Sequence, residues 1–247
     1  MKVIIYNKKH KRRYICYALL LCIAIVACIK IFTSNPKQVD LYPESVLGVP
    51  MYTQLVAEGD SARPGIERHI KYVVIHETGN FAHGADAKRH SLYITENNKT
   101  DTSWHYTVDD HSIYHHIPDT EVAWHAGDSL KKNGGNLCGI GVEICVNRDG
   151  DFEKAFDNAA RLTAYLVENY DLSVDDVKQH GDFINKNCPQ SIRDEGRTEE
   201  FKERVKKYLQ EIKTQEKKEG EKYESNDYRC ELGNRKGYGA CALGDGI

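Results

Sequence analysis

The chain has 247 residues, of which 40% are hydrophobic and 29% are charged. This composition excludes a collagen-like, low-complexity or wholly disordered chain, and the length predicts one main domain with additional segments at its ends. The first 32 residues hold seven basic residues and no acidic one, so the other 215 residues carry a net charge of about −10. An acidic main body argues against nucleic acid as a partner, because phosphate binding needs clustered Lys and Arg.

The N-terminus combines a basic segment with an apolar run. Residues 1–13 include the sequence KKHKRR, and residues 14–32 contain a single charge, Lys30, close to their end. A helix of about 19 residues at roughly 1.5 Å each can cross a bilayer core. By the positive-inside rule, we expect a cytoplasmic segment over 1–13, a single-pass transmembrane anchor over 14–32 and an extracytoplasmic remainder. A cleaved signal peptide and a lipoprotein signal with lipidation at Cys28 are the alternatives.

The rest of the chain divides by composition. Residues 33–65 hold four of the six prolines and little apolar periodicity, which predicts an extended stalk. The main domain is expected over 66–212, and 213–247 is a charged, then Gly-rich tail of unknown role. The elements expected in the domain are a strand at 71–76, a helix at 85–98, a hairpin at 104–117, a strand at 139–146 and helices at 153–170 and 201–212. Strands interspersed with helices predict an α/β architecture with a central sheet.

Three residues stand out as possible metal ligands. His76 ends a predicted buried strand, where a side chain can project from the sheet edge, and His180 and Cys188 lie eight residues apart in HGDFINKNCP. Two imidazoles and a thiolate suit Zn²⁺, and a fourth, open position is typical of catalytic zinc. The spacing alone is weak, because a single His and Cys at this distance usually coincide by chance.

The cysteine count is odd outside the predicted membrane span. Three cysteines lie within 14–32, and five lie beyond it: Cys138, Cys145, Cys188, Cys230 and Cys241. One is left over if the others pair. Cys230 and Cys241 could close a small loop, and pairing of Cys138 with Cys145 stays open.

Seven sequence blocks together resemble one family. They are YVVIHETGN (72–80), GADAKRH (84–90), SWHYTVDD (103–110), IPDTEVAWHAGD (117–128), GIGVEICVN (139–147), VKQHGDF (177–183) and KNCPQSIR (186–193). In this order they resemble the type 2 N-acetylmuramoyl-L-alanine amidases, the zinc-dependent peptidoglycan amidases related to the peptidoglycan recognition proteins. The resemblance covers roughly residues 66–210. It implies a mixed central β-sheet flanked by helices, with zinc in a groove on one side.

The resemblance also implies roles for individual residues. One zinc ion per chain would be bound by His76, His180 and Cys188, which also accounts for the unpaired cysteine. Glu143 and Lys186 would be catalytic, with Glu143 moving protons and Lys186 stabilising the tetrahedral oxygen. The expected substrate-binding residues are His125, Trp124, His105 and Asn80. Without the resemblance, Glu143 is equally well an outward-facing strand residue, Lys186 a solvated lysine, and His125 and His105 packed histidines.

The implied reaction is hydrolysis of the amide between the lactyl group of N-acetylmuramic acid and L-alanine in peptidoglycan. The expected partners are peptidoglycan and, through the anchor, the membrane, with the domain facing the cell wall; no protein partner can be inferred. The chain departs from the family pattern at Phe183-Ile184-Asn185, where an aromatic residue followed by Ser-Gly is usual, and at 198–200, where a tryptophan is absent. A non-catalytic module that binds peptidoglycan or muropeptides is the alternative function.

Overall fold

The computed structural model describes residues 42–97 and 101–235, with side chains described in 42–96 and 101–218. The predicted anchor at 14–32 lies outside the described residues. In the part of the chain that is described, no helix is both long and apolar enough to cross a membrane.

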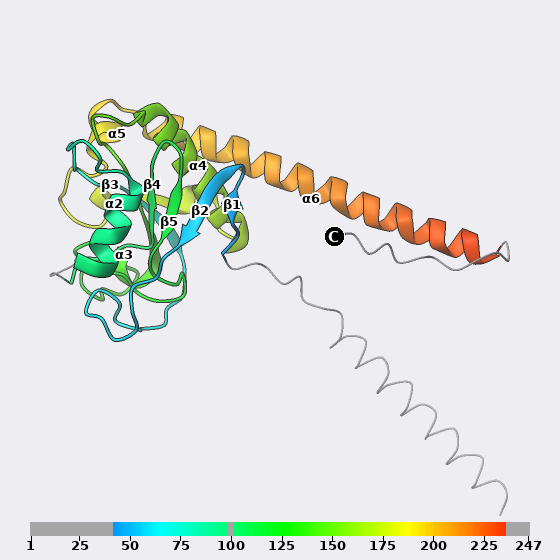
Figure 1. The fold of residues 1–247 in the computed structure, drawn as a ribbon, viewed down its shortest axis with the longest axis horizontal. Coiled ribbons are helices and arrows are strands. Elements are labelled where there is room, and N and C mark those ends of the chain that lie inside the picture. The colour runs from blue at the N-terminus through cyan, green and yellow to red at the C-terminus, as the bar shows by residue number, and fades with distance from the viewer. Residues whose placement is uncertain (1–41, 98–100, 236–247) are drawn as a thin grey trace, which may run out of the picture. The chain divides into compact units, whose positions relative to one another are not determined.

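A mixed seven-stranded sheet forms the centre of the domain (Figure 1). Its strands, in the spatial order β1-β2-β5-β4-β6-β3-β7, are β1 Ser45–Val46, β2 Val49–Thr53, β5 Ile113–His115, β4 Tyr106–Val108, β6 Gly139–Ile144, β3 Tyr72–Glu77 and β7 Val177–Gln179. The pairs β1–β2 and β4–β5 are antiparallel, and the other neighbours are parallel. The predicted α/β class with a mixed central sheet is therefore confirmed.

The central strands form where apolar runs occur in the sequence. Strand β3 is buried on both faces between β6 and β7, which is typical of the continuous apolar runs of parallel sheets. The predicted hairpin is confirmed as β4–β5. Its turn is held by the Asp109 carboxylate, which accepts hydrogen bonds from the backbone N–H groups of His111 and Ser112 at 2.9 and 2.7 Å.

The prediction of a stalk over 33–65 is wrong for its described part beyond Pro43. Residues 45–53 form two strands of the sheet, and Val49 and Met51 of β2 point into the core. Val56 and Ala62 then join an apolar cluster with Trp104. The pairing of β2 with β5 joins segments about sixty residues apart, so neither segment signals it locally.

Five α-helices accompany the sheet in the described residues, together with short helical turns. The helices are α2 Ala87–Leu92, α3 Gly135–Cys138, α4 Phe152–Asn169, α5 Gln190–Asp194 and α6 Thr198–Arg235, with the π-helical turn η1 Tyr93–Asn97 continuing α2. The prediction for α4 is confirmed to within a residue at each end, with Asp151 capping it through the Lys154 N–H at 3.2 Å. Helix α6 starts close to the predicted helix at 201–212 but continues to Arg235, into the predicted tail.

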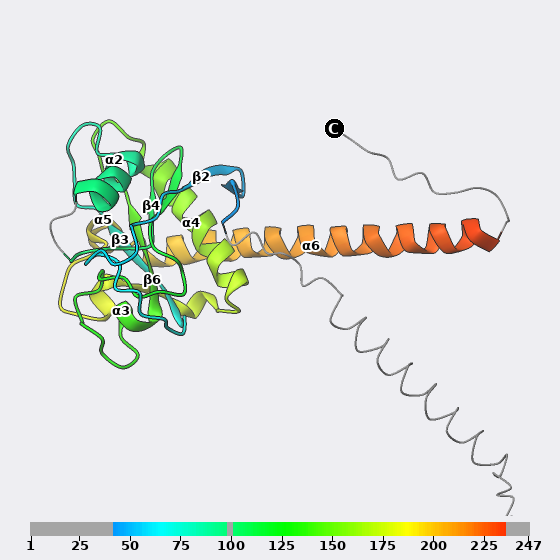
Figure 2. The ribbon, with the colours of Figure 1, turned by 60° about the horizontal axis from the view of Figure 1, so that its bottom comes forward.

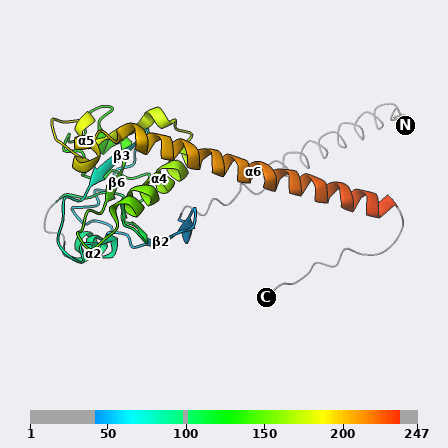
Figure 3. The same cartoon turned by 90° about the horizontal axis from the view of Figure 1, so that it is seen from above.

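Helices α4 and α6 pack against each other, and α4 also contacts the sheet (Figures 2 and 3). Phe156 of α4 is fully buried, and its ring lies 5.2 Å from that of Phe201 in α6. The guanidinium groups of Arg197 and Arg204 lie over the face of Phe156 at 4.4 and 4.7 Å. This contact closes the domain near positions 198–200, where the family pattern has a tryptophan that this chain lacks.

Candidate metal centre

The sheet topology brings His76 and His180 to the same edge. His76 is the fifth residue of β3, and His180 follows directly after β7, which is parallel to β3 with Ile75 opposite Gln179. The ends of adjacent parallel strands meet at one edge of a sheet. His180 opens the short helical turn η3 His180–Asp182, so its ring turns toward His76 instead of continuing along the strand.

Gly181 lets the chain return with Cys188 beside the two histidines. The Gly181 N–H donates to the Cys188 carbonyl oxygen at 3.0 Å, which closes the loop 181–188 on itself. A Cβ on Gly181 would lie 2.6 Å from the carbonyl oxygen of Lys186. Only a glycine therefore allows the segment carrying Lys186 and Cys188 to lie this close.

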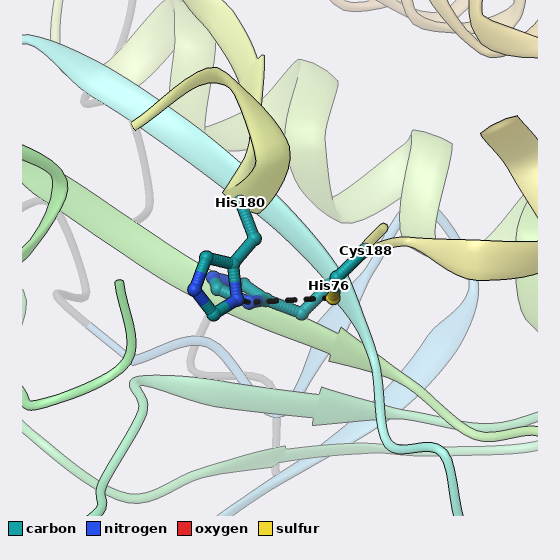
Figure 4. Close-up of side chains that lie close together, drawn as sticks. All are labelled: His76, His180 and Cys188. Atoms are coloured by element: carbon teal, nitrogen blue, oxygen red, sulfur yellow. Dashed lines mark hydrogen bonds between the residues drawn. The ribbon is translucent and has the colours of Figure 1, made fainter. Parts of the chain in front are cut away.

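The three side chains form a compact, buried group (Figure 4). The Nδ1 atoms of His76 and His180 lie 3.0 Å apart, and the Cys188 Sγ lies 3.9 Å from His76 Nδ1. Their ligand atoms all lie within 4.8 Å of one another. The exposed fractions are 1% for His76, 4% for His180 and 6% for Cys188. Three residues from two distant parts of the sequence thus point their ligand atoms at one place.

Hydrogen bonds fix the tautomer of His76. His125 Nε2 lies 3.1 Å from the Gly139 carbonyl oxygen, which can only accept, so Nε2 carries the hydrogen. His125 Nδ1 is then an acceptor, and it lies 3.0 Å from His76 Nε2, which donates. His76 Nδ1 is left with a free lone pair, directed at His180 and Cys188. This is the arrangement in which a second residue orients a metal-binding imidazole.

The residues fit a zinc ion. Tetrahedral zinc with bonds of about 2.1 Å to nitrogen and 2.3 Å to sulfur separates two nitrogens by about 3.4 Å, and nitrogen from sulfur by about 3.6 Å. The observed separations of 3.0 and 3.9 Å are close to these values. The group can therefore hold a metal ion, and its nitrogen and sulfur atoms are consistent with zinc.

The protonation states also suit metal binding. Burial lowers the pKa of His76 well below its usual value and that of His180 to about 4, so both rings are neutral at pH 7. Burial raises the pKa of the Cys188 thiol to about 11, and the nearby Glu143 adds to this. A cation that binds here replaces the thiol proton, so binding releases a proton to solvent.

Glu143 and Lys186 lie beside this group. Glu143 is directly opposite His76 in the β3–β6 register, and its Oε1 lies 3.9 Å from His76 Nδ1. Its Oε2 is buried and makes no hydrogen bond. Burial raises the pKa of Glu143 to about 8, and the charge of Lys186 opposes this shift. Lys186 itself is exposed on the loop that carries Cys188.

A cavity of about 440 Å³ opens onto the group. Besides His180, Cys188, Glu143 and Lys186, it is lined by residues that include Thr78, Asn80, His90, Tyr93 and Trp104. Tyr93 and Arg89 come from α2 and the turn that follows it, and sequence reasoning did not single them out. Arg89 lies within the block GADAKRH, which resembles the family, and Tyr93 follows three residues after its end. This position was the only sequence feature that pointed to them.

The four expected substrate-binding residues occupy different places. Asn80 and His125 line this cavity, but both ring nitrogens of His125 are engaged by His76 and Gly139. Trp124 lines a separate hollow, which shares only Thr102 with the first. His105 is fully buried, and its Nδ1 accepts a hydrogen bond from the Gly141 N–H at 2.9 Å. This burial contradicts a substrate contact for His105, which instead supports the strand beneath His125.

The cysteines outside the group do not form disulfides where the structure describes them. Cys138 and Cys145 are both free and buried, which settles the open question of their pairing. Cys230 and Cys241 lie outside the residues whose side chains are described.

Comparisons with known proteins agree with this site. The family model described as N-acetylmuramoyl-L-alanine amidase matches residues 66–191, about half of the chain. The amidase XlyA of Bacillus subtilis (strain 168) is 42% identical over 146 residues, which make up 59% of this chain and 48% of the relative. The amidase CwlH of the same organism is 45% identical over 132 residues, 53% of this chain and 52% of the relative. The chain thus spans about half the length of these curated relatives.

Solved structures show the same fold. The catalytic domain of XlyA superimposes with a TM-score of 0.60 at 39% identity, covering 64% of this chain and 99% of that chain. The structure of PlyL gives a TM-score of 0.57 at 30% identity, with 64% and 97% covered.

Proposed function

The chain belongs to the N-acetylmuramoyl-L-alanine amidase family, and on this premise we propose that it hydrolyses the amide between N-acetylmuramic acid and L-alanine in peptidoglycan, with one zinc ion per chain. The observation that carries the proposal is the group His76, His180 and Cys188 with Glu143 beside it, at a cavity large enough for part of a substrate. A purely structural metal site does not require an unpaired carboxylate oxygen, such as Oε2 of Glu143, next to its ligands.

The roles of the side chains follow from their positions. His76, His180 and Cys188 would hold the metal, which when bound would supply a polarised carbonyl and a water of lowered pKa. Glu143 takes a proton from the attacking water and returns it to the leaving nitrogen, since its carboxylate lies beside His76 and its Oε2 has no hydrogen-bond partner. Lys186, which lines the cavity and whose charge acts on Glu143, stabilises the negative charge that develops on the carbonyl oxygen.

The test is digestion of purified peptidoglycan by the full-length chain in detergent, with and without a chelator, beside Cys188→Ala and Glu143→Gln. We expect free stem peptides that begin with L-alanine, detected by mass spectrometry, and their loss with chelator and in both variants. If the chain binds one zinc ion and retains binding to peptidoglycan but releases no peptide, the domain is a recognition module instead.

We further propose that the domain is held at the cell membrane by residues 14–32 and faces the cell wall. The apolar run and the basic residues before it support this. Fractionation of cells that express the full chain tests it: we expect the protein in the membrane fraction and sensitive to external protease. Release after signal cleavage, or labelling of Cys28 by lipid, would replace the single-pass anchor by one of its alternatives.

A further inference from the structure

Glu77, the residue after His76, connects the strand that carries one metal ligand to the loop that carries another. Its side chain is 8% exposed. One carboxylate oxygen, Oε2, accepts hydrogen bonds from the backbone N–H and the hydroxyl of Ser191, both at 2.9 Å. The other, Oε1, accepts from the backbone N–H of Ile192 at 3.1 Å. Every oxygen of this buried carboxylate is therefore bound to one short segment.

That segment is the first turn of α5, which begins two residues after Cys188. Helices leave their first N–H groups without partners inside the helix. The residue at the N-cap of α5 is Pro189, which provides no side-chain hydrogen bond. Glu77 thus takes the place of the missing cap from 114 residues away in the sequence. Hydrogen bonds to an ionised carboxylate are also stronger than those to a neutral group.

The strand that carries Glu77 also meets Cys188 directly. The Cys188 Sγ lies 3.9 Å from Nδ1 of His76, the residue before Glu77. Strand β3 and the Cys188 loop are therefore joined at two points, one at the sulfur and one at the helix that follows it. The Gly181 N–H, at 3.0 Å from the Cys188 carbonyl oxygen, provides the third connection from the side of His180.

We propose that Glu77 is a positioning residue that holds the Cys188 sulfur at its distance from His76 and so sets the affinity of the site for its metal. Without the carboxylate, the first turn of α5 loses its partners, and Ser191 and Ile192 can draw Pro189 and Cys188 away from β3. Loss of residues that orient metal ligands weakens metal binding by about 10- to 100-fold. This inference rests on one part of the proposed function, namely that the site binds zinc.

Glu77→Ala and Glu77→Gln separate the carboxylate from the rest of the side chain. Glutamine keeps one oxygen that accepts hydrogen bonds, but its NH₂ group cannot accept one from the donors of α5. The zinc affinity of Glu77→Gln should therefore lie between those of wild type and Glu77→Ala. Asp151→Ala is the matched control, because Asp151 also caps a helix with its carboxylate, but at α4 and outside the cavity.

Two measurements on the full-length chain in detergent test the proposal. Zinc affinity is measured by competition with a chromophoric chelator, and the Co²⁺-loaded protein is examined for the near-ultraviolet band of a cobalt–thiolate bond. We expect Glu77→Ala to bind zinc about 10- to 100-fold more weakly than wild type and to show a weaker thiolate band. Asp151→Ala should match wild type in both. Circular dichroism of the metal-free proteins identifies variants that fold.

A folded Glu77→Ala protein with wild-type zinc affinity and an unchanged cobalt band would overturn the proposal and leave Glu77 a purely structural residue. If Glu77→Ala does not fold, Ser191→Ala, which removes one of the three hydrogen bonds, takes its place and must weaken zinc binding by a smaller factor; unchanged affinity overturns the proposal there too. Neither readout involves peptidoglycan. A wild-type chain that binds zinc but releases no peptide therefore refutes the proposed function and leaves this inference standing.

Discussion

The replacement His125→Phe tests whether His125 orients a metal ligand or contacts substrate. Phenylalanine fills most of the same space but removes both ring nitrogens. His76 Nε2–H, which is 3.0 Å from His125 Nδ1, then loses its acceptor, and the Gly139 carbonyl oxygen loses its donor at 3.1 Å. Each buried group left without a partner costs about 1–3 kcal/mol.

The loss should appear in metal binding as well as in stability. The ring of His76 is no longer held in one tautomer, and we expect zinc affinity to fall about 10- to 100-fold, which corresponds to about 1.4–2.7 kcal/mol. The assays are chelator competition for zinc, denaturant unfolding, and the rate of peptide release from peptidoglycan over a range of concentrations. His111→Phe is the control, because His111 is 65% exposed and does not line the cavity.

The reasoning is refuted if His125→Phe keeps wild-type zinc affinity and stability while peptide release falls through a higher KM. That result would assign His125 to substrate binding, as the sequence predicted. A fall in zinc affinity with a similar fall in stability would assign it to the support of His76.

Three further predictions follow from the same structure. Gly181→Ala places a Cβ 2.6 Å from the Lys186 carbonyl oxygen, a backbone atom that cannot move aside cheaply, so we expect weaker zinc binding in the chelator assay; wild-type affinity would contradict this. Burial holds the pKa of His105 and His116 well below 6.5, so these rings stay neutral in the folded protein while the unfolded chain binds protons as the pH falls below 6.5. The free energy of unfolding should therefore drop by about 1.4 kcal/mol per histidine between pH 7.5 and 5.5, and His116→Gln should lessen the drop. Phe156→Ala, which empties a fully buried site, should cost about 3–5 kcal/mol by denaturant unfolding, and a loss under 1 kcal/mol would show that the α4–α6 contact adjusts to it.

Local patterns in the sequence were enough for the elements that are regular and apolar. The run that becomes β3 is a continuous apolar segment that is buried along almost its whole length, and α4 shows the periodicity of one buried face together with an N-cap at Asp151. The metal-binding group could be anticipated only because several blocks together resembled a family. His76 and His180 lie 104 residues apart, and no local rule connects them.

Other features depend on contacts between distant segments. Residues 45–53 looked like a stalk because two short strands with a proline carry almost no pattern of their own, and their pairing with β5 supplies the missing stability. His105 and His125 look alike in sequence, each beside a tryptophan, yet His105 is fully buried against Gly141 of β6 and His125 lines the cavity.

The sequence by itself determined the class of the fold, most of its central elements and the chemical types gathered at the site, because these follow from side-chain character and periodicity. Only the tertiary structure decided that Glu143 lies opposite His76, that His125 fixes the tautomer of His76, and that Glu77 caps the helix behind Cys188. Each of these is a hydrogen bond or strand register between residues far apart in the chain. Such contacts are set by the packing of the whole domain, and the neighbours of a residue in sequence do not encode them.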